Sequence, residues 1–567
     1  MTLRLISLTT ALTAALTINS QTPASTYKEA GNGNPISPCV FCADPTALVY
    51  NGRVYVYGSN DHQQFIVNGK QGNNDYGKIK SLVVFSSVDM ANWTFHGTID
   101  VAKLCSSWGW RFAASWAPSA VWRTTADGKD EFFLYFANSG GSIGVLKASS
   151  PIGPWSSPLS KPMIDASTPG VSPCNWIFDP GVVVDDEGTG WMAFGGGDPQ
   201  PTGSKLMPGN SRIARLKPSM TAIDGAAVNL PAPYLFEASE LNMMAGRYIY
   251  TYNTSWSDRN DWTGYAKRNG QAAPSACSMC YMVSDTPLNP DSWEYRGEYV
   301  PNEGNFGFGW GNNHTRLQKF KDSYYVFFHS SMLEQALNSG ASGFRSIGVN
   351  KVTVNEAQQK ISKLTMTKSG ATPVATLDPY VLQEAETMAT AGGVSYEHFT
   401  NITKPTTIST LGNDASKNLQ VKMVPGAWTM VRQADFGPQG ATSFTLRAKG
   451  SGTLEVRLDS RTANAAATVE FSSATFADHT VELDASKFQN VRNVYFVFTA
   501  ADGVFFDAWQ FGHLSADGIA TATAARRNAT GSYGLDGQVI QDRRHRGIVI
   551  EQYTDADGAK HAHKVVR

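Results

Sequence analysis

Charged residues are scarce in this chain of 567 residues, at 17% of the total against roughly 25% in an average soluble protein. The 47 basic and 48 acidic residues nearly cancel and leave a net charge of −1. Because a dedicated nucleic-acid binder gains its affinity by neutralising phosphates, this balance argues against that class. The length allows two to four domains. A hydrophobic content of 42% argues against wholesale disorder.

Long hydrophobic runs are missing as well. The only candidate is Leu5 to Leu16, which follows Arg4 and is too short and too rich in threonine to span a bilayer. With small residues at Ile18 to Ser20, residues 1–20 are typical of an export signal. We therefore expect a secreted, extracellular protein without a membrane partner. Attachment to the cell surface is a second option.

Cysteine is also sparse. The six cysteines stand at positions 39, 42, 105, 174, 277 and 280. The pairs Cys39/Cys42 and Cys277/Cys280 have C-x-x-C spacing, which suggests zinc in a cytosolic protein. Behind an export signal, disulfide bonds are the favoured interpretation, and zinc or redox chemistry is the alternative. The sequence does not give the pairing.

Aromatic residues and β-hairpin signals are what the chain has in abundance. Between about residues 30 and 365, an apolar run, a turn and an aromatic-rich run follow one another five times, with turns near 51, 127, 187, 246 and 322. Serine-rich runs that precede Trp93, Trp155 and Trp293 indicate outer strands. Five units of roughly four strands predict a five-bladed β-propeller, which we place at residues 27–370.

The C-terminal third has a different pattern. A linker rich in Thr, Ser, Pro and Gly covers about 366–380, and short alternating strands follow it. These runs are Ser443 to Arg447, Thr453 to Leu458, Thr468 to Phe471, Thr480 to Leu483 and Val494 to Phe498. They predict a jelly-roll β-sandwich at 379–513, so the whole fold is all-β. Residues 514–567 form a tail with a last hairpin near Asp555 to Gly558, from which we expect little function.

Five residues stand at similar offsets ahead of the five hairpin turns. They are Asp44, Trp116, Asp179, Glu237 and His314, at 7, 11, 8, 9 and 8 residues before the turn. The innermost strands of a propeller line its axis, so these side chains should meet at one mouth. A single acidic residue there is usually a turn or cap residue, whereas three at the same phase favour a site. Crowded carboxylates raise at least one pKa, which gives the acid and base that glycosidic hydrolysis requires.

These motifs resemble glycoside hydrolase family 43 over about 330 residues. The matching text is Ala43-Asp44-Pro45, Tyr57 to Asp61, Trp116-Ala117-Pro118, Phe178-Asp179-Pro180 to Asp186, Glu237 after Phe236, and Asn312-Asn313-His314. The resemblance implies a five-bladed propeller that inverts anomeric configuration. It implies that Asp44 is the general base, that Glu237 is the general acid, and that Asp179 tunes and orients the acid.

The same resemblance implies further site residues. Trp116, Arg345, Asp61 and Asn313 are expected to contact substrate, and His314 resembles a histidine near the axis that is associated with a calcium ion or a water. Two departures stand out. Ala238-Ser239-Glu240 follows the acid in place of a Gly or Pro, which makes Glu240 a rival acid, and Met243 and Met244 stand where the family has a lysine.

The predicted sandwich resembles family 6 carbohydrate-binding modules. The resemblance lies in Glu384-Ala385-Glu386, in the strand pair at 440–459 and in residues 506–511. It implies a structural calcium held by Glu384, Glu386 and Asp507, and hard oxygen ligands suit that ion. Phe506 replaces an asparagine that is usual there, which weakens the case for sugar binding at the usual cleft. Trp428 is either a stacking platform or a core residue. No organic cofactor is expected.

The combined resemblance is to arabinoxylan arabinofuranohydrolases. It predicts a monomeric, exported, inverting glycoside hydrolase that removes α-L-arabinofuranosyl branches from arabinoxylan, a plant cell-wall polysaccharide. A β-xylosidase is the nearest alternative, followed by enzymes directed at arabinan or galactan. An inactive carbohydrate-binding propeller is the non-enzymatic alternative, but it would not need three carboxylates at one phase.

Overall fold

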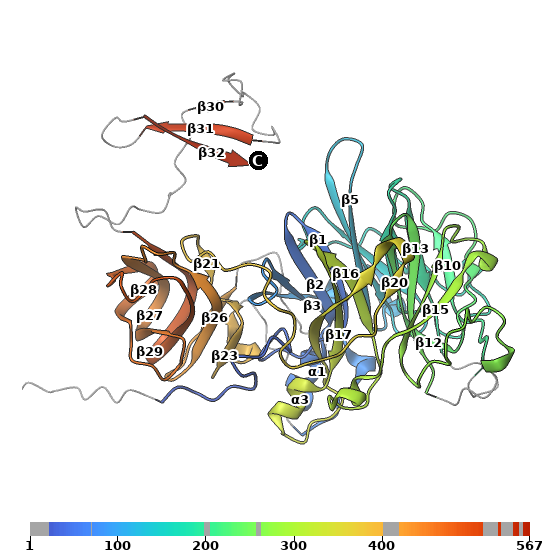
Figure 1. Cartoon of the computed structure of the whole chain (residues 1–567), viewed down its shortest axis with the longest axis horizontal. Coiled ribbons are helices and arrows are strands. Elements are labelled where there is room, and N and C mark those ends of the chain that lie inside the picture. Colours follow the sequence, from blue (N-terminus) through green and yellow to red (C-terminus); the bar gives the residue numbers. More distant parts are fainter. Residues whose placement is uncertain are drawn as a thin grey trace, which may run out of the picture. The chain divides into compact units, whose positions relative to one another are not determined.

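The computed structural model describes residues 22–69, 71–197, 205–256, 262–400 and 419–513, together with the backbone of three later strands (Figure 1). The predicted export signal lies outside these residues. The chain divides into two compact units, Met1–Phe511 and Gly512–Arg567. No helix in the described residues is long and apolar enough to cross a membrane.

The second unit is a small antiparallel sheet. Its strands are β30 (Gly531–Tyr533), β31 (Ile548–Thr554) and β32 (Lys560–Val566). Strands β31 and β32 pair from Thr554 with Lys560 outward. They therefore flank the predicted hairpin turn, whose own residues lie outside the described ranges.

Five antiparallel sheets of the first unit form the blades of a β-propeller (Figure 1). The first blade consists of β1 (Ala43–Tyr50), β2 (Arg53–Ser59), β3 (Leu82–Ser87) and β4 (Trp93–Ile99). The second consists of β5 (Trp116–Thr124), β6 (Asp130–Ala137) and β7 (Ile143–Ala148). The third consists of β8 (Gly181–Val184), β9 (Gly190–Phe194), β10 (Arg212–Arg215) and β11 (Val228–Asn229). The last two are β12 (Leu235–Met244), β13 (Arg247–Thr254), β14 (Met279–Ser284) and β15 (Glu294–Val300); and β16 (Thr315–Phe320), β17 (Ser323–Ser330) and β18 (Ser346–Val352). The innermost strands contact one another in the order β1, β5, β8, β12 and β16, and β16 contacts β1. The sheets thus close into a ring, which confirms the predicted propeller.

Each predicted hairpin turn joins the first two strands of a blade. In the first blade, Tyr50 pairs with Arg53 across Asn51 and Gly52, whose φ angles are 49° and 74°. Two positive φ angles suit the right-handed twist of a hairpin, and Asn-Gly adopts them readily. The predicted outer strands are also present in two blades, since β4 begins at Trp93 and β15 begins directly after Trp293.

The ring is closed by the N-terminal segment. The Ile36 N–H donates to the Ile347 carbonyl, and the Cys42 N–H donates to the Arg345 carbonyl. The Asn34 side chain bonds both backbone groups of Val349 in β18. This segment therefore lies beside the last strand of the fifth blade and leads directly into β1 of the first. The seam between the two blades runs past Asp44 and Arg345.

Short helices lie in the connections between strands. They are α1 (Asp61–Asn68), α2 (Val101–Leu104), α3 (Met332–Leu337), and the 3₁₀ turns η1 (Tyr76–Lys78), η2 (Ser106–Arg111), η3 (Trp262–Gly264), η4 (Pro290–Ser292), η5 (Glu303–Phe306), η6 (Glu356–Gln358) and η7 (Tyr396–His398). A two-stranded ribbon, β19 (Val354–Asn355) with β20 (Lys360–Ile361), follows the fifth blade. The Asn60 side chain accepts the Gln63 N–H and caps α1. This cap fixes Asp61 at the first helical position.

The described residues of 383–400 and 419–512 form a curled antiparallel sheet in place of the two separate sheets of an ideal sandwich. Its strands are β21 (Gln383–Glu384), β23 (Thr390–Gly392), β24 (Phe399–Thr400), β25 (Gln420–Lys422), β26 (Trp428–Asp435), β27 (Ser443–Leu458), β28 (Ala467–Glu482) and β29 (Val491–Gly512). The first two predicted runs merge into β27, because Gly450, at φ 97°, lets the strand bend without ending. A Cβ at Gly450 would lie 2.5 Å from the Gly503 carbonyl oxygen.

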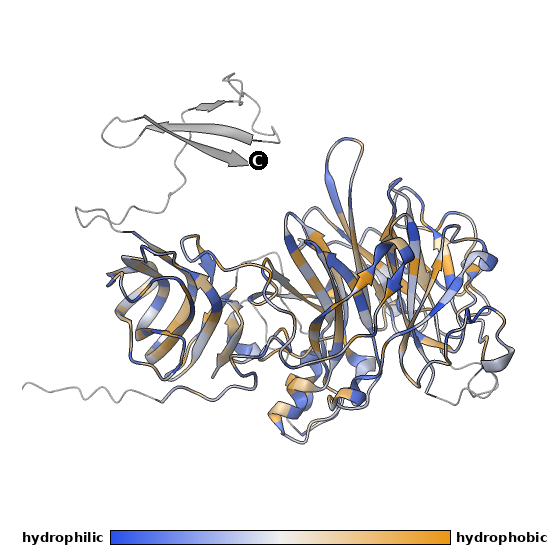
Figure 2. Cartoon of the chain, in the orientation of Figure 1, coloured by the Kyte–Doolittle hydropathy of each residue, from blue (hydrophilic) through white to orange (hydrophobic). Residues whose placement is uncertain are grey.

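The curled sheet is joined to the first blade by backbone pairing. Strand β22 (Thr387–Met388) pairs with β4, Thr387 opposite Thr94 and Met388 opposite Trp93. The Asn92 side chain also bonds both backbone groups of Arg432. One buried apolar cluster contains residues of both sheets, including Phe95 and Phe399. Figure 2 shows apolar and polar residues mixed along the strands, as expected where one strand face is buried.

Candidate active site

A pocket of about 380 Å³ opens where the innermost strands begin. It is lined by Asp44, Tyr76, Trp116, Ala117, Ser139, Gly140, Trp176, Phe178, Asp179, Glu237, Asn312, His314 and Arg345. The structure thus brings together all five of the residues that stand at similar offsets ahead of the hairpin turns. Residues from all five blades meet at one end of the propeller axis.

Backbone irregularities aim these groups inward. Asp44, Ala117, Asp179 and Ala238 have φ angles of 51°, 37°, 47° and 63°, a left-handed conformation that costs energy for residues other than glycine. The pairing register shifts beside three of them, in β1, β5 and β12. These bulges turn backbone amides toward the neighbouring blade: the Ala117 N–H donates to Ser59 Oγ at 2.9 Å, and the Ala238 N–H donates to Asp179 Oδ2 at 2.8 Å.

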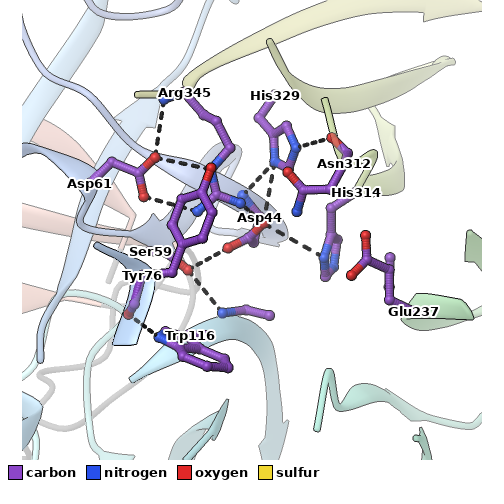
Figure 3. A network of polar contacts seen from close by, with 12 residues as sticks. Asp44, Ser59, Asp61, Tyr76, Trp116, Glu237, Asn312, His314, His329 and Arg345 are labelled. Carbon is purple, nitrogen blue, oxygen red and sulfur yellow. Dashed lines mark hydrogen bonds and ion pairs between the residues drawn. The ribbon is translucent and has the colours of Figure 1, made fainter. Parts of the chain in front are cut away.

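Asp44 is the best-paired carboxylate of the pocket (Figure 3). Its Oδ1 lies 2.8 Å from Arg345 Nη1, and its Oδ2 accepts the Ser59 hydroxyl at 2.7 Å. Burial alone would raise the pKa of Asp44, but the Arg345 guanidinium holds that pKa well below its usual range. Asp44 is therefore ionised.

Two histidines stand beside Asp44. The Asp44 N–H donates to Nδ1 of His329 at 2.9 Å, while Nε2 of His329 lies 2.7 Å from the Asn312 carbonyl oxygen. These contacts assign the ring proton of His329 to Nε2. Nδ1 of His314 lies 3.9 Å from Asp44 Oδ1, and burial lowers the pKa of His314 to about 4. His314 is neutral and lines the pocket.

Asp179 and Glu237 form no ion pair among the described residues, in contrast to Asp44. Burial, reinforced by the charge of Asp44, raises the pKa of Asp179 to about 8. Burial and the neighbouring Asp179 and Asp44 carboxylates raise the pKa of Glu237 well above its ordinary value. The pocket therefore holds one ionised carboxylate and two carboxyl groups that favour the protonated form.

The rival acid Glu240 does not reach the pocket. Its side chain is fully buried, its Oε2 lies 2.7 Å from Arg316 Nη1, and the Ser119 hydroxyl donates to it at 3.3 Å. These contacts place Glu240 in the interior of the axis. Glu237 and Glu240 lie on one strand, but only Glu237 faces the cavity.

Arg345 is held in place by a residue outside the pocket. Asp61 is fully buried, and its two oxygens bond Nε and Nη2 of Arg345 at 2.9 Å each (Figure 3). The Arg345 guanidinium also lies 4.6 Å from the centre of the Tyr76 ring. The structure therefore places Asp61 behind Arg345, and the predicted substrate contact at Asp61 is not among the pocket-lining residues.

Asn313 is not brought to the pocket either. It is fully buried and its amide donates to the Pro301 carbonyl at 3.4 Å, while its neighbour Asn312 lines the cavity. Trp116 does line the pocket, and its indole donates to the Tyr76 carbonyl at 2.7 Å. Trp176 forms another wall, partly exposed and in edge contact with Phe178 and Phe236.

Several site residues were missed in the sequence. Tyr76, Ser139 and Gly140 come from connections between strands, and His329 and Ser59 lie at the ends of second strands. None of them stands at the offset shared by the predicted residues. Trp176 alone carried a usable signal, because it stands three residues before Asp179 in the same apolar approach to the third blade.

The disulfide prediction is wrong. No two of the six cysteines, all of which lie in the described residues, form a disulfide bond, and five of them are buried. The two C-x-x-C pairs sit in the protein interior: Cys280 packs inside the fourth blade, while Cys277 contacts Asn253 and the Gly311 carbonyl next to the pocket. Burial raises the pKa values of the Cys39 and Cys42 thiols to about 12. No zinc cluster forms there, since no metal-holding group appears in the described part of the chain.

The predicted calcium ligands of the curled sheet are close to one another but not assembled. The charges of Glu384 and Asp507, added to burial, raise the pKa of Glu386 well above its ordinary value, and its buried Oε2 has no hydrogen-bond partner in the described part of the chain. Asp507 Oδ2 lies 3.0 Å from Nε of Arg447. Across the described ranges, no three His, Cys, Asp or Glu side chains form a metal-holding group, His314 included. Trp428 is fully buried, so it is a core residue.

Comparisons with known proteins agree with this geometry. The profile for "Glycosyl hydrolases family 43" matches residues 18–357, and that for "Carbohydrate binding module (family 6)" matches residues 384–513. An arabinoxylan arabinofuranohydrolase from Bacillus subtilis (strain 168) is 38% identical over 507 residues, which cover 86% of this chain and 94% of the relative. One from Paenibacillus polymyxa is 37% identical and covers 85% and 74%.

A solved structure gives the same result. The crystal structure of a glycoside hydrolase family 43 arabinoxylan arabinofuranohydrolase from Bacillus subtilis, in complex with cellotetraose, superimposes with a TM-score of 0.75 at 36% identity. The match covers 86% of this chain and 99% of that one. The similarity therefore includes both the propeller and the curled sheet.

Proposed function

Because the chain belongs to glycosyl hydrolases family 43, we propose that it is an inverting enzyme that removes α-L-arabinofuranosyl branches from arabinoxylan. The observation that carries the proposal is the single pocket in which carboxyl groups of three blades meet, one beside a guanidinium and two without an ion pair in the described residues. Two relatives that match more than four-fifths of the chain are arabinoxylan arabinofuranohydrolases, which supports the substrate.

Asp44 has the properties of the general base. In an inverting reaction, a water attacks the anomeric carbon while a carboxylate takes a proton from that water. Asp44 is ionised because Arg345 holds its pKa low, and it is fixed by Ser59 as well. The reaction expects a separation of roughly 6.5–9.5 Å between the base and acid carboxyl groups. That separation remains a prediction for Asp44 and Glu237.

Glu237 has the properties of the general acid. It must carry a proton at working pH and give it to the oxygen of the departing xylan chain, and its raised pKa meets that need. Asp179 accepts the N–H of Ala238, the residue after Glu237, so it anchors the backbone that carries the acid. The proton that Asp44 gains and the proton that Glu237 loses balance the hydrolysis.

The walls of the pocket favour removal of one sugar at a time. The cavity of about 380 Å³ is bounded by Trp116, Trp176 and Tyr76, and Arg345 supplies its only cationic group among the lining residues. Aromatic faces pack against the apolar faces of sugar rings, and the charged groups bind hydroxyls. We propose Trp116 and Arg345 as substrate contacts on this basis.

Identification of the released sugar tests the proposal. The full chain is incubated with arabinoxylan, arabinan and xylo-oligosaccharides, and the monosaccharide products are separated. Arabinose from arabinoxylan is the expected product. Release of xylose from xylo-oligosaccharides would instead identify a β-xylosidase, and binding without any released sugar would identify an inactive propeller. An Asp44→Asn preparation serves as the control for contaminating activity.

Three further properties are proposed on narrower grounds. The N-terminal sequence supports export to the extracellular medium. We propose that the chain acts as a monomer. We also propose a structural calcium in the curled sheet, because the unpartnered Glu386 Oε2 and the nearby Glu384 are hard oxygen donors. The Arg447 contact counts against Asp507 as a third ligand.

A further inference from the structure

The acid candidate Glu237 has one side-chain anchor. It lies in β12 between two register shifts, opposite Asn253 of β13. The Asn253 side chain donates from Nδ2 to Glu237 Oε1 at 3.5 Å, and this is the one hydrogen bond to the Glu237 carboxyl among the described residues. Catalytic hydrogen bonds are often long before substrate binds and tighten in the reacting complex. Asn253 is fully buried, so water does not compete for its amide.

A thiol fixes the orientation of this amide. Nδ2 of Asn253 also donates to Cys277 Sγ at 3.4 Å, and Sγ donates its own proton to the Gly311 carbonyl at 3.5 Å. Burial raises the pKa of the Cys277 thiol, so it keeps that proton. Since the S–H proton is directed to Gly311, the sulfur faces Asn253 as an acceptor. The Asn253 atom that faces Cys277 and Glu237 must therefore be the NH₂ group.

Cys277 is itself held rigidly. Its φ angle is 46°, its N–H donates to the Ser255 carbonyl at 3.1 Å, and its carbonyl accepts the Asn302 amide at 3.2 Å. The same Asn302 amide donates to the Gly311 carbonyl at 2.9 Å. Gly311 directly precedes Asn312 of the pocket wall. The thiol therefore joins the strand that faces Glu237 to the loop that lines the pocket.

We propose that Asn253 and Cys277 form a positioning pair that holds Oε1 of Glu237 and leaves Oε2 as the oxygen that carries the transferred proton. An oxygen that accepts an N–H bond is poorly placed to hold a proton of its own in that direction. With Oε1 occupied by the Asn253 amide, the O–H bond forms on Oε2 and turns toward the pocket, where the glycosidic oxygen binds. This inference rests on the proposed acid role of Glu237.

The pair also acts on the acidity of Glu237. Donation from Asn253 stabilises the carboxylate form and so lowers the pKa of Glu237, against burial and against two carboxylates, which raise it. The titratable and charged groups that surround Glu237 are Asp44, Asp179, Arg345, Glu303 and Cys277. Removing the Asn253 donor should therefore move the alkaline limb of the rate profile to higher pH, because the acid keeps its proton longer.

Variants of both residues test the pair on two substrates. One substrate is arabinoxylan, whose leaving group needs a proton, and the other is an aryl arabinofuranoside with a good leaving group, which does not. Asn253→Ala should slow arabinoxylan hydrolysis about 10- to 100-fold, a fraction of what a general acid contributes, with a much smaller loss on the aryl substrate. Cys277→Ala should show a weaker form of the same pattern. Cys277→Ser, which keeps a donor and an acceptor, should restore most of the lost rate.

Two controls separate positioning from packing and from the acid role. Cys280→Ala removes a buried thiol three residues further along the chain, in β14, without touching Glu237, and its rates should match those of the wild type. Asn253→Leu keeps a side chain of similar size and adds no charge, so it carries the test if Asn253→Ala does not fold. The pair would be overturned if the Asn253 variant lost the same factor of rate on both substrates, or if its alkaline limb did not move. The acid role would stand in that case if Glu237→Gln still lost more rate on arabinoxylan than on the aryl substrate. If Glu237→Gln lost the same factor of rate on arabinoxylan and on the aryl substrate, that result would overturn both the acid role of Glu237 and the positioning pair.

Discussion

Glu237 and Glu240 stand three residues apart on β12 and face different environments. Glu240 is fully buried against Arg316, at 2.7 Å, and the Ser119 hydroxyl also reaches it. Glu237 is half-buried, borders the cavity and has one long contact to Asn253. Burial raises the pKa of both, but Arg316 pulls that of Glu240 back, whereas the Asp179 and Asp44 carboxylates raise that of Glu237 further.

The two glutamates belong to two layers of the axis. In the interior layer, the Ala120 N–H donates to Thr46 Oγ1 and the Val182 N–H donates to Ser119 Oγ, so side chains join neighbouring blades. The Glu240–Arg316 pair continues this layer from β12 to β16. At the mouth, the same kind of cross-blade bond is made by Asp179, whose carboxyl forms no ion pair within the described ranges. Strand β12 therefore supplies both a structural carboxyl, Glu240, and a reactive one, Glu237. The difference follows from the cation beside Glu240, which is Arg316.

The base at the mouth gives the largest expected effect. Asp44→Asn should reduce turnover by at least about 10³-fold, because an amide cannot take the proton of the attacking water. The variant should still fold, since the single asparagine oxygen can accept an Arg345 N–H and Arg345 keeps both of its bonds to Asp61. Product release and thermal unfolding check both statements. Near-normal turnover in this variant would refute the assignment of Asp44.

A mutation in the interior layer should lower the stability of the protein rather than its turnover. Arg316→Met leaves Glu240 buried without its cation, and breaking such a pair costs about 3–5 kcal/mol of the free energy of unfolding. The turnover of folded molecules should stay within about twofold of the wild type, because Arg316 does not line the pocket. Urea unfolding and active-site-normalised rates measure the two effects. An Arg316→Met protein as stable as the wild type would mean that the pair does not stabilise the axis.

Arg345 should set the acid limit of activity. Its planar fork bonds Asp44 and Asp61 together, and a lysine cannot reproduce both contacts. In Arg345→Lys the pKa of Asp44 should rise toward its ordinary value. Because the base must be ionised, activity is then lost at a higher pH as the solution is acidified. The acid limb of kcat/KM against pH measures this shift, and an unmoved limb would show that Arg345 does not control Asp44.

The smallest expected effect concerns Glu386 in the curled sheet, where the partner of a buried carboxyl should again determine its role. Its buried Oε2 accepts no hydrogen bond from any residue that the structure describes, and such an oxygen suits a calcium ion. Calcium should raise the thermal midpoint of the full chain by a few degrees, and Glu386→Ala should abolish that rise. If calcium did not change the thermal midpoint of the wild-type chain, the proposed calcium site would be refuted.

The sequence predicted the propeller and the central carboxyls because both follow from repetition. Hairpin turns recur at regular spacing, and residues at one offset before them must meet at the axis, which brought Asp44, Asp179 and Glu237 together. Tyr76 and His329 were not predicted as site residues, because neither of them stands at that offset before a hairpin turn. The role of Asp61 was also invisible, since only the fold shows that Arg345 stands between it and the pocket.

The errors have local causes. Disulfides were expected because the cysteines follow an export signal, but Cys280 lies within β14 and packs in the blade interior, while Cys277 precedes the strand and turns toward Asn253. In the curled sheet, separate strands were expected where Gly450 allows one continuous bend. In both cases only the spacing of residues is visible in the sequence, whereas the outcome depended on side-chain direction and on one φ angle.

The matched variants Glu237→Gln and Glu240→Gln test the central claim most directly. Each is assayed on arabinoxylan and on an aryl arabinofuranoside with a good leaving group. Glu237→Gln should lose about 10²- to 10⁴-fold on arabinoxylan and far less on the aryl substrate, because only the first needs a proton from the acid. Glu240→Gln should lose stability but keep both rates. The reverse pattern, with Glu240→Gln losing arabinoxylan hydrolysis and Glu237→Gln retaining it, would contradict the account.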